Sequence, residues 1–252
     1  MAVLLCLLLI GCAEAEPEQT VAPTAAETIA VTELPTAAPT ELPTEQPTEA
    51  PAEMPTQVPT EPPEDDTLVR VEDFIPGIRE KLAYATENNF TKQKIYDFYD
   101  AYLRYGTVKK LAAVCEELEQ QGLGILIWDG FRPVSAQAAL WEAYPDPLFV
   151  SHPVTGTRTH CRGNAVDLTL VDLETGEMLH MPTDFDVFSD LADRDYSDCD
   201  PEAAENARLL ETVMEKHGFK PFWAEWWHYT DTQNYPVDET FEPPVGSEEA
   251  YE

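Results

Sequence analysis

The sequence predicts an α+β fold, with one compact domain over residues 67–235 in which a small, mainly antiparallel sheet is flanked by helices. Charge separates this domain from its flanks. Residues 13–66 hold 13 of the 48 acidic residues and residues 236–252 hold six, while neither segment contains a Lys or Arg. The intervening segment carries all 15 basic residues and is long enough to bury a core. Within it, helical spacing is mixed with short β-rich runs, without a regular βαβ repeat.

Three segments of the domain have the pattern of helices. Residues 107–121 place apolar side chains at three- and four-residue intervals and are followed by Gly122. Residues 133–141 form a second predicted helix, because Pro133 suits a first helical position. The third helix, residues 201–217, ends at Gly218.

Three other segments favour strands. The short apolar run 125–128 is rich in β-formers and is stopped by Asp129-Gly130, as expected for a buried strand. Residues 164–171 alternate, so that Asp167 lies on a polar face opposite Val166 and Leu168. Residues 219–230 are dense in aromatic side chains and predict a last strand.

The first residues have the character of a targeting segment. The apolar run 3–10 is too short to span a bilayer but fits an export signal. It ends in Leu9-Ile10-Gly11-Cys12, which resembles the lipobox of bacterial lipoproteins, in which the Cys is lipidated and becomes the mature N-terminus. We therefore expect residues 1–12 to be a lipoprotein signal peptide with Cys12 as the lipidation site. The alternative is an ordinary secretory signal cleaved elsewhere.

The two acidic flanks are expected to be disordered. In residues 13–66 a proline recurs every four residues from Pro35 to Pro63, mostly in Pro-Thr-Glu repeats, and proline in every turn excludes a helix. An extended linker remains, whose threonines are alternatively glycosylation sites. Residues 236–252 are expected to form a solvated acidic tail.

The charge of the chain limits its partners. A formal net charge of −33 disfavours DNA, RNA and anionic membrane surfaces. We therefore expect no nucleic acid partner, and membrane contact only through the lipid anchor at Cys12.

Two motifs carry residues that suit a metal ion. His160 lies in a turn, and Asp167 follows seven residues later on the polar face of a strand. Glu225-Trp226-Trp227-His228 lies in the last predicted strand, so that His228 is a candidate third ligand and Glu225 a candidate base. Three-residue spacing does not share a face of a regular strand, so this hypothesis requires a bulge, or Glu225 at the strand edge. The alternative for each motif is an ordinary hydrogen-bonded pair.

Two further charged residues are candidates for binding a substrate. Arg132 follows a predicted strand in Asp129-Gly130-Phe131-Arg132-Pro133, where it can hold a carboxylate or stabilise an oxyanion, or alternatively pair with Asp129. Asp186 can neutralise a substrate ammonium group, or alternatively be a solvated loop carboxylate.

Taken together, these motifs resemble the zinc D-alanyl-D-alanine dipeptidases, the VanX-type branch of the D,D-peptidase family. The similarity includes residues 82–91 and covers roughly residues 71–229. It implies a zinc-peptidase fold with one Zn²⁺ bound by His160, Asp167 and His228. It further implies that Glu225 is the catalytic acid and base, that Arg132 stabilises the transition state, and that Asp186 recognises the amino end of the dipeptide.

Some positions depart from the family pattern. Arg158 replaces a serine two residues before His160, and Cys161 replaces another serine. These changes affect the expectation of dipeptide specificity more than that of hydrolysis. Cys161 is alternatively a ligand or nucleophile, or a disulfide partner of Cys115 or Cys199.

The resemblance predicts hydrolysis of D-Ala-D-Ala to two D-alanines. If the chain is exported to the outer face of the cytoplasmic membrane, D-Ala-D-Ala is mostly available at the ends of peptidoglycan stems. A D,D-carboxypeptidase acting on those stem peptides is therefore the second hypothesis. The third is a surface module that binds wall peptide without catalysis, which the presence of Glu225 beside three metal ligands disfavours.

Overall fold

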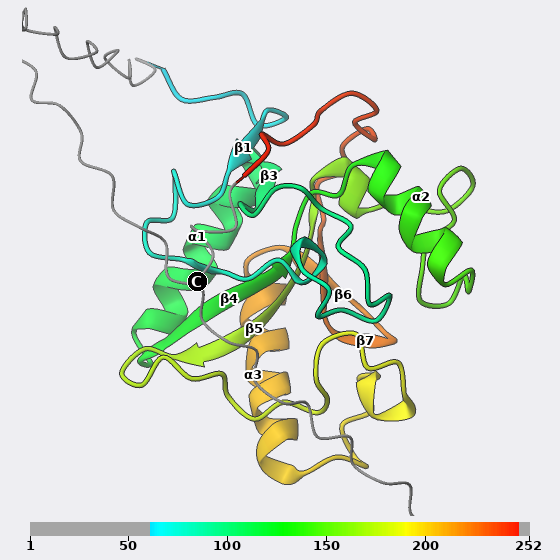
Figure 1. Cartoon of the computed structure of the whole chain (residues 1–252). Coiled ribbons are helices and arrows are strands. Elements are labelled where there is room, and N and C mark those ends of the chain that lie inside the picture. Colours follow the sequence, from blue (N-terminus) through cyan, green and yellow to red (C-terminus); the bar gives the residue numbers. More distant parts are fainter. Residues whose placement is uncertain (1–60, 247–252) are drawn as a thin grey trace, which may run out of the picture. The chain divides into compact units, whose positions relative to one another are not determined.

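The computed structural model describes residues 61–246 (Figure 1). The expected signal segment with Cys12, the linker up to residue 60 and residues 247–252 lie outside the described part of the chain. No helix within residues 61–246 is long and apolar enough to cross a membrane.

The domain is built on a five-stranded sheet in the order β2-β4-β5-β7-β6 (Figure 1). Its strands are β2 (Arg79–Glu80), β4 (Leu123–Asp129), β5 (Ala165–Asp172), β6 (Phe219–Phe222) and β7 (Glu225–Asp231). The β2–β4 pair is parallel and the other pairs are antiparallel. A second antiparallel pair joins β1 (Leu68–Arg70) to β3 (Tyr102–Arg104). The predicted α+β class is therefore confirmed.

Two long helices pack against the sheet and against each other (Figure 1). The first, α1 (Tyr105–Glu119), begins two residues earlier than expected, and Gly122 follows it with a φ of +74°. The second, α3 (Pro201–Lys216), is capped by the Asp200 carboxylate, which accepts a hydrogen bond from the Glu202 N–H. Their apolar faces lie in one core with Val166, Leu168 and Leu170 of β5.

The remaining helix and the short 3₁₀ turns lie in the connections. Helix α2 (Val134–Ala143) follows β4, and Pro133 is its N-cap rather than its first helical residue, because its ψ of 148° is extended. The 3₁₀ turns are η1 (Ala83–Ala85), η2 (His160–Arg162) and η3 (Asp190–Ala192). Both η1 and η2 contribute side chains to the site described below.

The last predicted strand is wrong as a single element, because residues 219–230 form the hairpin β6–β7. Trp223 and Ala224 make the turn without the Gly, Asn or Asp that usually marks one in a sequence. The register shifts within this hairpin. Pro221 pairs with Tyr229, whereas Phe222 pairs with Glu225, so three residues of β7 are left between the two pairs. The irregularity required by the spacing of Glu225 and His228 is therefore present.

The folded part is wider than the expected 67–235. At the N-terminal side, the Asp65 carboxylate lies 2.6 Å from Lys109 Nζ on α1. At the C-terminal side, the ring of Phe241 contacts Tyr102 and Phe131 at centroid distances of 5.4 and 5.3 Å, and the Gly246 N–H donates to the Asp97 carbonyl. The expectation of a solvated tail from residue 236 is thus corrected for residues 236–246, which pack on the domain.

The three cysteines of the described part, Cys115, Cys161 and Cys199, are free thiols. Burial raises the pKa of the Cys161 thiol to about 11, and this side chain does not line the cavity described below. It is therefore a poor metal ligand or nucleophile.

Candidate active site

His160 is positioned by a tight turn beside the end of β4. The turn η2 ends at Gly163, whose φ of +71° lies in the left-handed region and where a Cβ would clash with the side chain of Leu68. The ring of His160 is buried, and its Nδ1 lies 2.8 Å from the Gly130 carbonyl oxygen. A carbonyl only accepts, so Nδ1 carries the proton and Nε2 presents a lone pair to the site.

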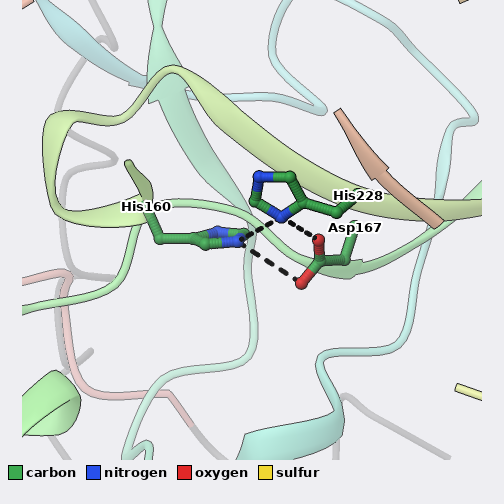
Figure 2. A group of neighbouring side chains, drawn as sticks. All are labelled: His160, Asp167 and His228. Atoms are coloured by element: carbon green, nitrogen blue, oxygen red, sulfur yellow. Dashed lines mark hydrogen bonds and ion pairs between the residues drawn. The ribbon is translucent and has the colours of Figure 1, made fainter. Parts of the chain in front are cut away.

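Asp167 and His228 are brought together by strand pairing. They face each other in the register of β5 and β7. Asp167 Oδ1 lies 2.9 Å from His228 Nδ1, and Oδ2 of the same carboxylate lies 3.4 Å from His160 Nε2. The two imidazole nitrogens are 3.2 Å apart (Figure 2). Three residues separated by up to 68 positions therefore direct their polar atoms to one point.

This cluster fits a divalent cation. The ligand atoms of His160, Asp167 and His228 all lie within 4.8 Å of one another, and the three residues are buried. His228 Nε2 lies 3.1 Å from the Thr230 hydroxyl, which can accept its proton and leave Nδ1 free to bind a metal. Two nitrogen lone pairs and one carboxylate facing a single point is the donor set that zinc prefers at catalytic sites.

The electrostatics of the cluster favour an ionised Asp167. Burial opposes this charge, but the neighbouring imidazoles of His160 and His228 outweigh it and hold the pKa of the carboxyl well below its usual range. Burial lowers the pKa of His228, which favours the neutral ring that a metal ligand requires.

Glu225 is the first residue of β7 and lies beside the cluster. Its Oε2 is 3.9 Å from His228 Nδ1, and the residue is 8% exposed. Burial, reinforced by the charges of Asp167 and Asp186, raises the pKa of Glu225 well above its usual value. A carboxylate with a raised pKa next to a metal-ligand cluster is suited to accept and return a proton.

Arg132 lies in the same cavity and is held by an ion pair. Its Nη2 is 2.6 Å from Asp129 Oδ2, and its Nη1 donates to Gln137 Oε1 at 2.9 Å. The alternative considered from the sequence, a pair with Asp129, is therefore present. It does not remove Arg132 from the site, because the guanidinium still lines the cavity.

Asp186 lies at another wall of the cavity, in a left-handed conformation with a φ of +59°. The Tyr84 hydroxyl donates to its Oδ2 at 2.8 Å. Burial, together with the charge of Asp167, raises the pKa of Asp186 to about 8. It is therefore a half-buried, hydrogen-bonded carboxyl group rather than the solvated loop residue of the alternative.

All six expected site residues line one cavity of about 660 Å³. They are Arg132, His160, Asp167, Asp186, Glu225 and His228. Aromatic side chains, among them Phe90 and Phe188 with ring centroids 5.4 Å apart, form part of its wall. Arg158, which departs from the family pattern, does not line the cavity and pairs instead with Glu239 at 3.2 Å.

Several residues of the site were not identified as such from the sequence. Tyr84, Thr230 and Arg194 orient Asp186, His228 and the backbone of β7, respectively. Tyr84 lies 102 positions from Asp186, so no local pattern in the sequence links the two residues. Thr230 lies two positions after His228, and the alternation of a strand places both side chains on one face, which is a local signal.

Fold and site together define a class of protein. An α+β domain with a buried His-Asp-His cluster, a proton-accepting Glu and an Arg in one cavity has the arrangement of a single-metal hydrolase.

Comparison with known proteins narrows this class. The sequence model of the D-Ala-D-Ala dipeptidase family of peptidases matches residues 64–245. A D-alanyl-D-alanine dipeptidase of Escherichia coli K12 is 35% identical over 172 residues, covering 68% of this chain and 88% of that protein. Dipeptidases of the same description from Enterococcus faecium and Streptomyces coelicolor are 31% and 33% identical, each covering 69% of this chain and 96% of the relative. The chain belongs to the D-Ala-D-Ala dipeptidase family of peptidases.

Proposed function

We propose that this protein is a zinc peptidase that hydrolyses D-alanyl-D-alanine to two D-alanines. The observation that carries the proposal is the convergence of the six expected residues in one buried cavity of a chain that belongs to the dipeptidase family. His160, Asp167 and His228 would hold the zinc ion, since their donor atoms meet at one point.

The roles of the remaining residues follow from their positions. Zinc bound here would lower the pKa of a water molecule to about 7 and polarise the peptide carbonyl. Glu225 takes the proton of the attacking water and delivers it to the departing amine as the C–N bond breaks. Arg132, fixed by Asp129, supports the negative charge that develops on the carbonyl oxygen. Asp186, fixed by Tyr84, binds the ammonium group of the substrate.

The position of Asp186 also bears on the competing hypothesis of a D,D-carboxypeptidase. A carboxypeptidase must leave room on the amino side of the scissile bond for the rest of the stem peptide. Asp186 lines the cavity, is half-buried and accepts a hydrogen bond from Tyr84, which is 3% exposed, so a carboxyl group with a fixed partner occupies one end of the cavity. The contact therefore favours a substrate that ends in a free amino group.

Release of D-alanine by the purified, zinc-loaded full chain tests the proposal. We expect cleavage of D-Ala-D-Ala and little cleavage of a muramyl pentapeptide ending in D-Ala-D-Ala, with Glu225→Ala as the blank. Preference for the pentapeptide would replace the dipeptidase by a wall carboxypeptidase. Absence of D-alanine from both substrates would reject both activities.

We also propose that the chain is exported and anchored to the outer face of the cytoplasmic membrane through Cys12. The support is the sequence pattern Leu9-Ile10-Gly11-Cys12 after a short apolar run. Metabolic labelling with a radioactive fatty acid should mark the protein, and Cys12→Ser should abolish the label. An unlabelled native protein would show that the segment has another role.

A further inference from the structure

One cavity residue has no part in the proposed mechanism. Lys220 lies on β6, the edge strand of the sheet, and lines the same cavity as the metal-ligand cluster. It pairs with Thr230 across the β6–β7 hairpin, and side chains of a directly opposed pair lie on the same face of a sheet. Thr230 Oγ1 in turn lies 3.1 Å from the His228 ring. Lys220 is therefore next to the outer side of the cluster.

The charges of the cavity leave Lys220 available to a ligand. Besides its histidines, the cavity wall contains two basic residues, Arg132 and Lys220. Arg132 is engaged by Asp129, Gln137 and Tyr96. Within residues 61–246 no ion pair or hydrogen bond involves the Lys220 ammonium group, which is the cation best placed to meet a negatively charged end of a substrate.

Asp186 and Lys220 lie toward opposite edges of the sheet. Asp186 lies toward β4, because its hydrogen-bond partner Tyr84 stacks with Arg132, which follows β4. The neighbouring Phe185 packs between Trp128 of β4 and Trp227 of β7, at centroid distances of 4.9 and 5.6 Å. The metal-ligand cluster lies over β5 and β7, and Lys220 extends from β6. The order along the sheet is therefore carboxylate, metal-ligand cluster, ammonium.

The width of the sheet from β4 to β6 is large enough for a short peptide with an ammonium group at one end and a carboxylate at the other. From β4 to β6 is three strand spacings, or about 14 Å. A dipeptide spans roughly 7 Å from its ammonium to its carboxylate. The four-carbon stem of Lys220 is long enough to extend from β6 toward a dipeptide bound over the cluster.

We infer that Lys220 binds the free carboxylate at the C-terminal end of the substrate, on the leaving-group side of the metal-ligand cluster. The inference rests on the proposed dipeptidase activity and names a determinant of its specificity. The substrates selected are short peptides with an ammonium group at one end and a free carboxylate at the other.

Steady-state kinetics of the zinc-loaded full chain test this assignment. For D-Ala-D-Ala, Lys220→Ala should raise KM by about three- to tenfold with kcat nearly unchanged, as expected for an ion pair at the mouth of a cavity. Lys220→Arg should restore most of the affinity because it keeps the charge. Lys81→Ala, which removes an exposed lysine outside the cavity, is the matched control and should behave like the native protein.

A second substrate separates charge recognition from a structural effect. On D-alanyl-D-alanine amide, which lacks the carboxylate, the native protein and Lys220→Ala should have the same KM. An unchanged KM of Lys220→Ala for the free dipeptide would overturn the assignment of Lys220 and leave the dipeptidase proposal intact. An equal loss on both substrates would overturn it too. Failure of the native protein to cleave the dipeptide at all would overturn both proposals.

Discussion

At the scale of single residues, the pKa values of three carboxyl groups in one cavity are shifted in different directions. Asp167 lies between two imidazoles, which hold its pKa well below the usual range. Burial raises the pKa of Asp186 to about 8, and it raises the pKa of Glu225 well above its usual value. An ionised carboxylate that could bind a metal, beside a carboxyl group that can take up a proton, is the combination that metal-assisted hydrolysis would need.

Glu225 and His228 should therefore fail in different ways when substituted. Glu225→Ala removes the proton acceptor but no ligand, so we expect zinc content near one per chain and a loss of kcat of at least ~100-fold. His228→Ala removes a ligand and should lose both zinc and activity. Metal analysis and kinetics of the two variants side by side check this. Loss of zinc from Glu225→Ala, or retained turnover in either variant, would contradict the assigned roles.

The stability of the domain should depend on pH through Glu80, a residue outside the active-site cavity. Its Oε2 accepts the Ala101 N–H at 2.7 Å, whereas Oε1 is buried without a hydrogen-bond partner. Burial raises the pKa of this carboxyl from 4.5 to about 7. Between these values the folded state holds the proton that the unfolded state has lost, so the contribution of Glu80 to stability falls as pH rises.

Glu80→Gln should consequently make the melting temperature decline less between pH 5 and pH 8 than it does in the native protein. The slope is compared rather than the absolute value, because the amide also changes the local hydrogen bonding. Glu205→Gln, at an exposed position of α3, is the control and should keep the native slope. Parallel curves for Glu80→Gln and the native protein would show that Glu80 does not titrate in this range.

At the scale of secondary structure, the irregular strand β7 depends on one arginine. Because the register shift leaves Trp226, Trp227 and His228 without ladder partners on β6, their backbone needs other donors. Arg194 Nη2 donates to the carbonyl oxygens of Glu225, Trp226 and His228 at 3.0 to 3.1 Å. This side chain takes the place of the missing strand and holds the bulge that places Glu225 beside His228.

Arg194→Ala should therefore lower both stability and zinc affinity. It removes a donor shared by the carbonyl groups of Glu225, Trp226 and His228, which we expect to cost about 3 kcal/mol in the free energy of unfolding. Arg70→Ala removes a half-buried arginine whose ion pairs are with exposed carboxylates, and it should change stability by less than ~1 kcal/mol. Denaturant unfolding and zinc titration of both variants test this. Native zinc affinity in a folded Arg194→Ala protein would show that β7 keeps its bulge without the arginine.

At the scale of the whole domain, the C-terminal segment closes over the loops that carry the site. The Asp238 N–H donates to the carbonyl of Cys161, directly after His160. The ring of Phe241 packs on Phe131, directly before Arg132. Residues 236–246 thus brace two active-site loops from outside.

Two truncated proteins distinguish the contribution of residues 236–246 from that of residues 247–252. Ending the chain after Tyr235 should lower the melting temperature by several degrees and weaken zinc binding, because it exposes the apolar surface of Tyr102 and Phe131 and frees the His160 loop. Ending it after Gly246 keeps all of these contacts and serves as the matched control. Equal melting temperatures for the two truncated proteins would show that residues 236–246 do not brace the domain.

Much of the fold and the site was predictable because the information is local. The spacing in 107–121 and the segment 201–217, closed by Gly218, predict α1 and α3 within two residues of their observed bounds. The motifs around His160 and Glu225 supplied four of the six candidate residues that meet in the cavity, and Arg132 and Asp186 came from two other segments. By contrast, β1 and β2 are three and two residues long, too short to leave a pattern in the sequence.

The sequence by itself determined the residue types of the site, the helices and the resemblance to the dipeptidases, since each depends on neighbouring positions. Only the tertiary structure decided which groups are paired and which are free. Arg132 is held by Asp129, Asp186 accepts a hydrogen bond from Tyr84, and Lys220 faces the cavity without a partner among the described residues. The physical reason is that burial and strand register arise from contacts between distant segments. These contacts set the charge and direction of a side chain, and no local pattern records them.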